Sequence, residues 1–243
     1  RGFVVSSFGF VFPETGADAC PTGFNRGPVE RQAAGLPPLA DDCRAPESYA
    51  DPDYRTLDAD GTVAALDIDG ESSRKRDGGS CAHGDFTETS GAPGADDQLW
   101  RAIGCIRGFQ KGDIVGSVVD GAVRDGSMTI LVDVQGVDDP QNDDDVAVQV
   151  FSSKDAPPTG GDGSVLPYGT LGIDPDERFH SSVGHGRIEN GVVIAGPLDV
   201  RIRLNIQIVL GELSFRDAFV RVELHPDGTA SGGIFGFAPV SDV

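Results

Sequence analysis

The sequence is poor in basic residues and contains no long apolar run. Only 19 Lys and Arg stand against 39 Asp and Glu, which gives a formal net charge of −20. A chain with this charge is repelled by phosphate backbones and by anionic lipid surfaces, so nucleic acid is excluded as an expected partner. No stretch reaches the roughly 18 apolar residues that a membrane-spanning helix needs, so the sequence predicts no transmembrane segment.

The signatures of several common catalytic sites are also missing. The chain has no CxxC pair, which argues against zinc-finger and thioredoxin chemistry. It has no GxSxG elbow, no P-loop and no dinucleotide-binding fingerprint. Its many carboxylates offer chance pairs of the kind that glycosidases use, so a hydrolase with an unidentified site stays as a third interpretation. The sequence therefore favours a non-catalytic protein.

Four cysteines, Cys20, Cys43, Cys81 and Cys105, all lie in the first half of the chain. They allow three disulfide pairings. One possibility pairs nearest neighbours, Cys20 with Cys43 and Cys81 with Cys105. Each bond would close a loop of about 25 residues and stabilise the fold by roughly 3 kcal/mol. Disulfides in a region of thin core are typical of an oxidising compartment. We therefore expect an extracytoplasmic protein that is secreted, periplasmic or attached to the cell surface.

The 34 glycines and 16 prolines predict many turns between short strands, because both residues disfavour helix interiors. Residues 1–113 are expected to form a loop-rich region stapled by disulfides, with strands at 3–12 and 62–68. Residues 114–243 are expected to form an antiparallel sheet on which that region packs. We expect one compact domain overall.

One short helix is predicted at residues 96–104. Asp96 is in place to cap its start, and Gly104 is in place to end it. Leu99, Trp100 and Ile103 would form its apolar face.

The second half of the chain alternates apolar and polar residues, which is typical of strands. The pattern is seen at residues 128–134, 146–150, 200–208 and 219–224, and a last strand is expected at 234–237. The acidic linker between the first two segments predicts a hairpin. One-sided alternation indicates an antiparallel sheet with one wet face. The predicted fold is mostly β, an antiparallel β-sandwich, with a barrel as second choice.

Two Asp-x-Asp-Gly units, at residues 58–61 and 67–70, place paired carboxylates beside sharp turns. Calcium takes six to eight oxygen ligands from carboxylates and loop carbonyls, so these units are candidates for a calcium site. Neither unit completes an EF-hand loop. Nearby aspartates at positions 85, 96 and 97 would add oxygens. The alternative interpretation is that these aspartates form turns and caps. The predicted metal ligands are Asp58, Asp60, Asp67, Asp69, Asp85, Asp96 and Asp97.

Other polar groups are read as ordinary surface features. The acidic run Asp143–Asp145 is interpreted as a solvated hairpin tip, and residues 174–177 as a turn. His180 and His185 match no metal-binding spacing, and glycines beside His185 argue against a helix there.

Apolar strands are expected at both ends of the chain, at residues 3–12 and 232–238. Such strands can pair with an open sheet edge of a neighbour, or they can pair within their own domain. Two functions follow as expectations. The first is an extracytoplasmic module that binds calcium structurally and contacts another protein or a glycan. The second is a structural or accessory subunit of a larger, oligomeric assembly.

Overall fold

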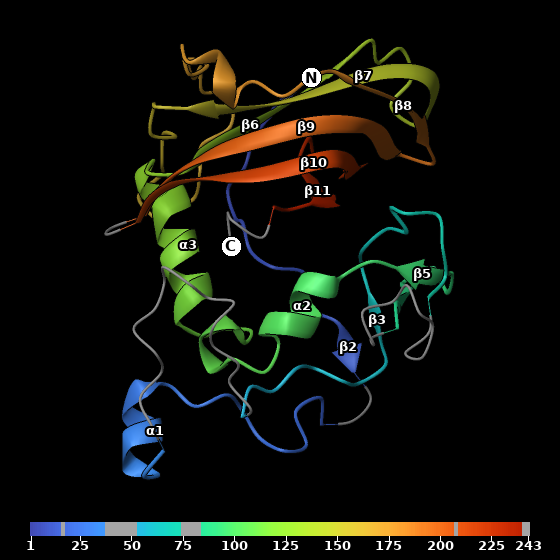
Figure 1. Cartoon of the computed structure of the whole chain (residues 1–243). Helices are drawn as coiled ribbons and strands as arrows, with labels where there is room; N and C mark the ends of the chain where they lie inside the picture. Colours follow the sequence, from blue (N-terminus) through green and yellow to red (C-terminus); the bar gives the residue numbers. More distant parts are fainter. Residues whose placement is uncertain (16–17, 37–52, 74–83, 207–208, 240–243) are drawn as a thin grey trace. The chain divides into compact units, whose positions relative to one another are not determined.

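The chain divides into two compact units. The sheet unit comprises residues 1–10 and 116–243, and the loop-rich unit comprises residues 11–115. The loop-rich unit is therefore inserted between the first strand of the sheet and the rest of it. The computed structural model describes residues 1–15, 18–36, 53–73, 84–206 and 209–239 (Figure 1).

Seven strands of the sheet unit form one antiparallel sheet, in the order β1-β6-β7-β8-β9-β10-β11. From β6 onward each strand pairs with the next one in the chain, so the sheet is a meander, and it curls into a half-barrel (Figure 1). The strands are β1 Gly2–Val4, β6 Thr129–Gln135, β7 Asn142–Ser153, β8 Gly184–Glu189, β9 Val192–Ile206, β10 Val209–Leu224 and β11 Ala230–Phe237.

Alternating apolar residues bury one face of this sheet. Val148 and Val150 on β7 are 0% and 1% exposed, and Val132 on β6 lies opposite Val150. On β9, Val200 and Ile202 are equally buried. Each such side chain stabilises the fold by roughly 1.5–3 kcal/mol relative to exposure. The prediction of pleated strands with one apolar face is confirmed in this half of the chain.

The first strand is shorter than predicted. A strand was expected over residues 3–12, but β1 ends at Val4, and Val5 donates one more hydrogen bond to the Ile130 carbonyl. In this register Thr129, where β6 starts, lies opposite Ser6. β6 could therefore pair with at most two residues after Val4 and with none of residues 7–12.

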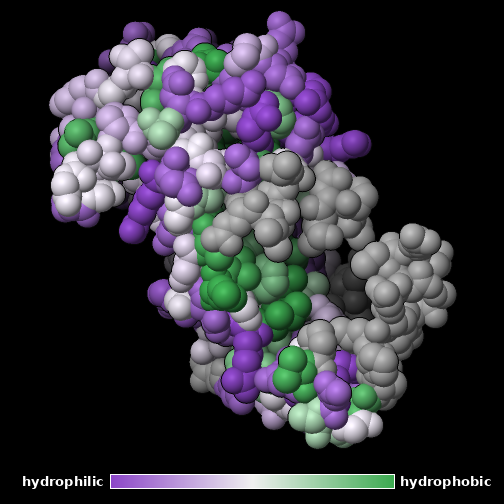
Figure 2. Space-filling model, turned by 90° about the vertical axis from the view of Figure 1, so that its left-hand side faces the viewer, coloured by the Kyte–Doolittle hydropathy of each residue, from purple (hydrophilic) through white to green (hydrophobic). Residues whose placement is uncertain are grey.

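A helix that the sequence analysis missed precedes β6. Helix α3, Ile114–Asp125, buries Ala122 and Val123 in the core of the sheet unit. Hydrophobic side chains gather at the height of α3 in Figure 2, and Ile114 at its start is 65% exposed. A short 3-10 helix, η3 (Glu177–Phe179), lies between β7 and β8 and buries Phe179.

The loop-rich unit holds a four-stranded sheet in the order β2-β3-β4-β5, in which β3 and β4 are parallel. Its small core contains Leu57, Phe86 and Trp100, and the ring of Phe12 meets Trp100 edge-on at 4.9 Å. The elements of this unit are β2 Glu14–Thr15, α1 Pro28–Ala33, β3 Gly61–Val63, β4 Phe86–Glu88, β5 Pro93–Ala95, α2 Gln98–Ile103 and η2 Arg107–Phe109.

The predicted helix at residues 96–104 is present as α2, with one correction. Asp97, not Asp96, caps it, because the Asp97 carboxylate accepts a hydrogen bond from the Trp100 N–H at 3.3 Å. Gly104 is the C-terminal cap as expected. The structure also contains α1 and α3, so the described residues hold three α-helices rather than one.

A disulfide joins Cys20 to Cys105, across 85 positions of sequence. The nearest-neighbour pairing is therefore wrong for both of these cysteines. Folding brings the two segments together, and the Asn25 N–H donates to the Cys105 carbonyl at 2.7 Å. Cys43 and Cys81 lie outside the described residues.

These findings confirm a mostly β protein with a loop-rich, disulfide-stapled N-terminal part. The larger sheet is curled into a half-barrel, so its form is intermediate between the predicted β-sandwich and the second choice, a barrel. Among the helices of the described residues, none combines the length and apolar character needed to cross a membrane.

Candidate functional site

Three of the seven predicted metal ligands come together in the loop-rich unit. Asp67, Asp69 and Asp96 each place one carboxylate oxygen within 4.8 Å of the others. Asp67 and Asp69 come from the second Asp-x-Asp-Gly unit, whereas Asp96 directly follows β5. This is the one group of three or more such side chains found among the described residues.

Backbone hydrogen bonds fix this arrangement. The Asp96 N–H donates to the Leu66 carbonyl, and the Asp96 carboxylate accepts from the Ile68 N–H at 2.9 Å. Within the turn, one Asp67 oxygen accepts from the Gly70 N–H at 2.7 Å, and one Asp69 oxygen accepts from the Glu71 N–H at 2.8 Å. One oxygen of each of the three carboxylates is engaged in this way, and no hydrogen bond from another described residue occupies the second oxygen.

Gly94 lets the two segments approach closely. Its φ is +98°, and a Cβ atom there would lie 2.9 Å from an Asp67 oxygen and 3.0 Å from the Glu71 carbonyl oxygen. Any larger residue would displace a carboxylate of the cluster or the turn that carries it. The Glu71 carbonyl is also a potential oxygen ligand beside the cluster.

The electrostatics of the cluster favour a bound cation. Burial raises the pKa of Asp96 to about 6, and the charges of Asp69 and Asp85 add to this rise. The hydrogen bonds from Ile68 and Asp69 act in the opposite direction. A divalent cation would favour the ionised carboxylates and relieve their repulsion. Carboxylate and carbonyl oxygens are the ligands that calcium prefers, so the residues fit that ion.

The other four predicted ligands act electrostatically on a cation that belongs to the protein, Arg101. Arg101 on α2 is only 4% exposed, and its guanidinium lies 3.7 Å above the Phe86 ring. It donates to the carbonyls of Ala59, at 2.6 Å, and Gly84, at 2.8 Å. Burial lowers the pKa of Arg101, and four carboxylates oppose this effect. Those carboxylates are Asp60, Asp58, Asp97 and Asp85.

The two Asp-x-Asp-Gly units therefore differ in role although they share the same motif. In the first unit, the carbonyl of Ala59, between the two aspartates, binds Arg101. In the second, the aspartates converge with Asp96. Arg101 lies four residues after the capping aspartate, but its burial is a tertiary property that its position in the sequence does not reveal.

The carboxyl group of Asp97 has a raised pKa. Burial raises its pKa to about 7, while the Trp100 N–H and the charge of Arg101 lower it. Its second carboxylate oxygen and the Arg101 Nε have no hydrogen-bond partner within the described part of the chain. At the start of α2, polar atoms of two charged side chains are thus buried without all of their hydrogen bonds being satisfied within the described residues.

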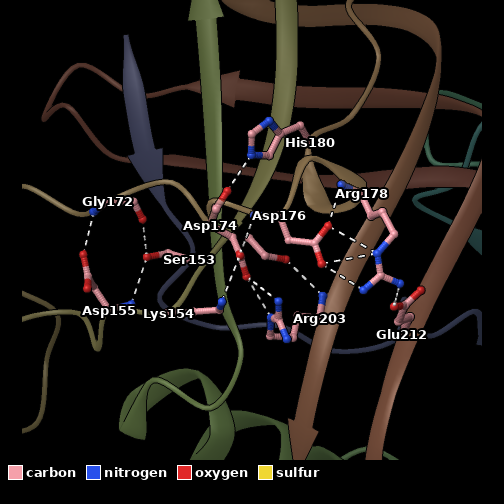
Figure 3. A network of polar contacts seen from close by, with 11 residues as sticks. Ser153, Lys154, Asp155, Gly172, Asp174, Asp176, Arg178, His180, Arg203 and Glu212 are labelled. Carbon is pink, nitrogen blue, oxygen red and sulfur yellow. Dashed lines mark hydrogen bonds and ion pairs between the residues drawn. The ribbon is translucent and has the colours of Figure 1, made fainter.

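A second polar cluster lies in the sheet unit and was not found from the sequence (Figure 3). Residues 174–177 were read as a turn, yet Asp174 is 1% exposed. Its carboxylate accepts from Arg203 on β9 at 2.7 and 2.8 Å and forms an ion pair with Lys154 at 3.4 Å. Burial by itself would raise the pKa of Asp174, but the Asp176 N–H, Arg203 and Lys154 together lower it.

The cluster continues to the surface through Asp176, Arg178 and Glu212. Arg178 forms ion pairs of 2.8 Å with both carboxylates, and Glu212 also meets Arg201 at 3.2 Å. Hydrogen bonds with Arg178 lower the pKa of Asp176. Every charge in this network has an opposite partner, so it ties the loop before β8 to β9 and β10.

The described histidines take part in ordinary contacts. The His180 Nε2 lies 2.6 Å from the Asp174 carbonyl, and its ring meets Phe151 edge-on. His185 is exposed on β8. The His225 Nε2 lies 3.0 Å from the Ser231 hydroxyl. His83 lies outside the described residues.

The fold and the site thus define a mostly β protein with a carboxylate cluster in a disulfide-bonded, loop-rich unit. No family model, no curated protein and no solved structure matches this chain.

Proposed function

We propose that this chain is a non-catalytic, extracytoplasmic module that binds calcium as a structural ion and contacts another protein or a glycan. The observation that carries the proposal is the convergence of Asp67, Asp69 and Asp96, each with one oxygen that accepts no hydrogen bond from the described residues. The disulfide between Cys20 and Cys105 supports the compartment, because such bonds persist where conditions are oxidising.

The chemistry of the cluster supports a weak site. Asp67 and Asp69 are exposed, and calcium needs further oxygens from carbonyls and water to complete its shell. We expect a Kd of about 0.1–1 mM, the range of extracellular calcium modules. Such a site is filled at extracellular calcium concentrations and would stabilise the turn at residues 67–70.

The test is the stability of the loop-rich unit with and without calcium. Trp100 is the single tryptophan of the chain and is buried in this unit, so its fluorescence reports on it alone. At pH 7.5, calcium at 100 times its Kd should stabilise the unit by about 2.7 kcal/mol. The readout is a urea or thermal unfolding curve in calcium and in chelator.

Matched variants locate the ion. Asp96→Asn should abolish the calcium-dependent shift, whereas Asp60→Asn, in the first Asp-x-Asp-Gly unit, should keep it. Curves that coincide in calcium and chelator would reject the proposal. A calcium shift that survives in Asp96→Asn would reject this site.

A second candidate function has its own supporting observation. β1 and β11, the first and last strands of the chain, are the two edges of the seven-stranded sheet. Edge strands present unpaired backbone groups to which another strand can bind. The second candidate is therefore a structural or accessory subunit that assembles through its terminal strands.

A further inference from the structure

The two edges of the main sheet are its least charged parts. The longest stretches of the sequence without Asp, Glu, Lys or Arg are residues 2–13 and 228–241. They contain β1 and β11, the strands at either edge of the sheet. In a chain in which 24% of residues are charged, both open edges are thus left without charge.

This is the reverse of how edge strands are usually protected. Proteins discourage edge pairing with charged side chains, prolines, bulges or very short strands. β1 is protected by its length of three residues. β11 has eight residues, none of them charged and none of them proline, and its one irregularity is a register shift against β10 between Phe235 and Phe237. Among the described residues, β11 pairs with β10 on one side and with no strand on the other (Figure 1).

The side chains of β11 suit a strand that is paired on both sides. Ile234 and Ala230 pack against the core of the sheet unit, so the strand is held in register on β10. Phe237 at its end is 49% exposed. Ser231 and Gly232 are also exposed and place no bulk in the way of an added strand.

The net charge of the chain limits how two copies can approach each other. A second copy also carries a formal charge of −20, so most approaches between two copies bring carboxylates together. Pairing β11 with β11 of a second copy keeps this cost low at the contact itself, since neither strand has a charged side chain. An antiparallel pair of identical strands is also two-fold symmetric, which is the commonest symmetry of homo-oligomers.

We propose that the outer edge of β11 binds β11 of a second copy, which joins two seven-stranded sheets into one continuous antiparallel sheet. This inference rests on the second candidate function and names its strand and its partner. β1 is not the partner strand, because three residues offer too few backbone pairs.

Sedimentation velocity over a range of protein concentrations tests the proposal on the full chain. The natural chain should form a dimer, and added salt should strengthen it by screening the like charges. Combining Ser231→Lys and Phe237→Lys should weaken dimerisation at least tenfold, because it places charges along the pairing edge. His185→Lys, on the exposed face of the interior strand β8, is the matched control and should leave the dimer intact.

Hydrogen exchange gives a second readout that does not depend on the variants. Backbone amides of β11 should become more protected as the concentration of the natural chain rises, while those of β7 should not change. A chain that stays monomeric would overturn the inference. A dimer that persists in the double lysine variant, without added protection of β11, would overturn this edge and leave assembly by another surface.

Discussion

The two units of this protein order their chains by different means. The sheet unit buries a continuous apolar face in which consecutive strands pair with each other. The loop-rich unit has only short strands, and a disulfide, a buried arginine and an aspartate cluster connect its segments. Where apolar and polar residues alternate regularly, burial of the apolar face orders the strands. Where this alternation is weak, specific bonds between residues far apart in the sequence order the chain instead.

The units also place their carboxylates differently. In the sheet unit, cations and N–H groups surround Asp174 and Asp176, and the pKa of each carboxyl is lowered. In the loop-rich unit, burial dominates, and the pKa values of Asp96 and Asp97 are raised to about 6 and about 7. The surroundings of Asp174 and Asp176 thus stabilise the ionised carboxylate, whereas burial of Asp96 and Asp97 disfavours it.

The largest expected difference between the units concerns the disulfide. Replacing both Cys20 and Cys105 with alanine should destabilise the loop-rich unit by roughly 4 kcal/mol, because the bond closes a long loop of the unfolded chain. Trp100 fluorescence should therefore lose its native signal at lower urea concentration, while the β signal in circular dichroism should persist. Simultaneous loss of both signals would show that the units unfold as one.

The buried ion pair of the sheet unit should give the next largest effect. Asp174→Asn leaves Arg203 without its counter-charge and should destabilise this unit by about 3 kcal/mol, near the lower end for a broken buried pair, since Arg203 retains some solvent contact. The exposed neighbour variant Asp176→Asn is the control and should have a much smaller effect. Urea unfolding followed by circular dichroism measures both. Equal effects of the two substitutions would contradict the role of burial.

The two units should also respond to pH in opposite directions. With calcium removed, the raised pKa values of Asp96 and Asp97 stabilise the loop-rich unit at about pH 4, and this contribution should disappear as pH rises through 6 and 7. In the sheet unit the pKa values of Asp174 and Asp176 are lowered, so the stability of this unit depends on pH in the opposite direction. Their contribution is present above about pH 4 and is lost as pH falls further.

Unfolding midpoints by Trp100 fluorescence and by circular dichroism, taken from pH 3 to pH 8 in chelator, check both signs. Adding calcium should remove the part of the loop-rich unit's decline that is due to Asp96, whereas the part due to Asp97, which lies outside the cluster, should remain. Parallel pH profiles for the two signals would contradict the comparison.

The strands of the sheet unit could be predicted because alternation is a local property. Whether Val148 or Gln149 faces the core follows from the pleat itself, and the structure confirms it. The end of β1 could not be predicted in the same way. Residues 5–12 are as apolar as a strand, but their pairing depends on where β6 begins.

The candidate site could be predicted only in part, because its residues meet through the tertiary fold. The sequence pointed to both Asp-x-Asp-Gly units, yet nothing local shows that Arg101 is buried beside one of them. The pairing of Cys20 with Cys105 and the burial of Asp174 depend in the same way on distant segments. The sequence did contain one indication of a partner for Asp174, because Arg201 and Arg203 alternate with apolar residues on β9 and a partly buried cation favours a carboxylate partner.

The strand order has a consequence for biosynthesis. Gly2 lies opposite Asp133 in the sheet, so β1 leaves the ribosome more than a hundred residues before its partner does. At typical elongation rates of about 5–20 residues per second, this leaves an apolar, uncharged segment unpaired for about 7–26 seconds. The remaining strands each follow their neighbour directly. Within the main sheet, β1 is therefore the strand that waits longest for its partner.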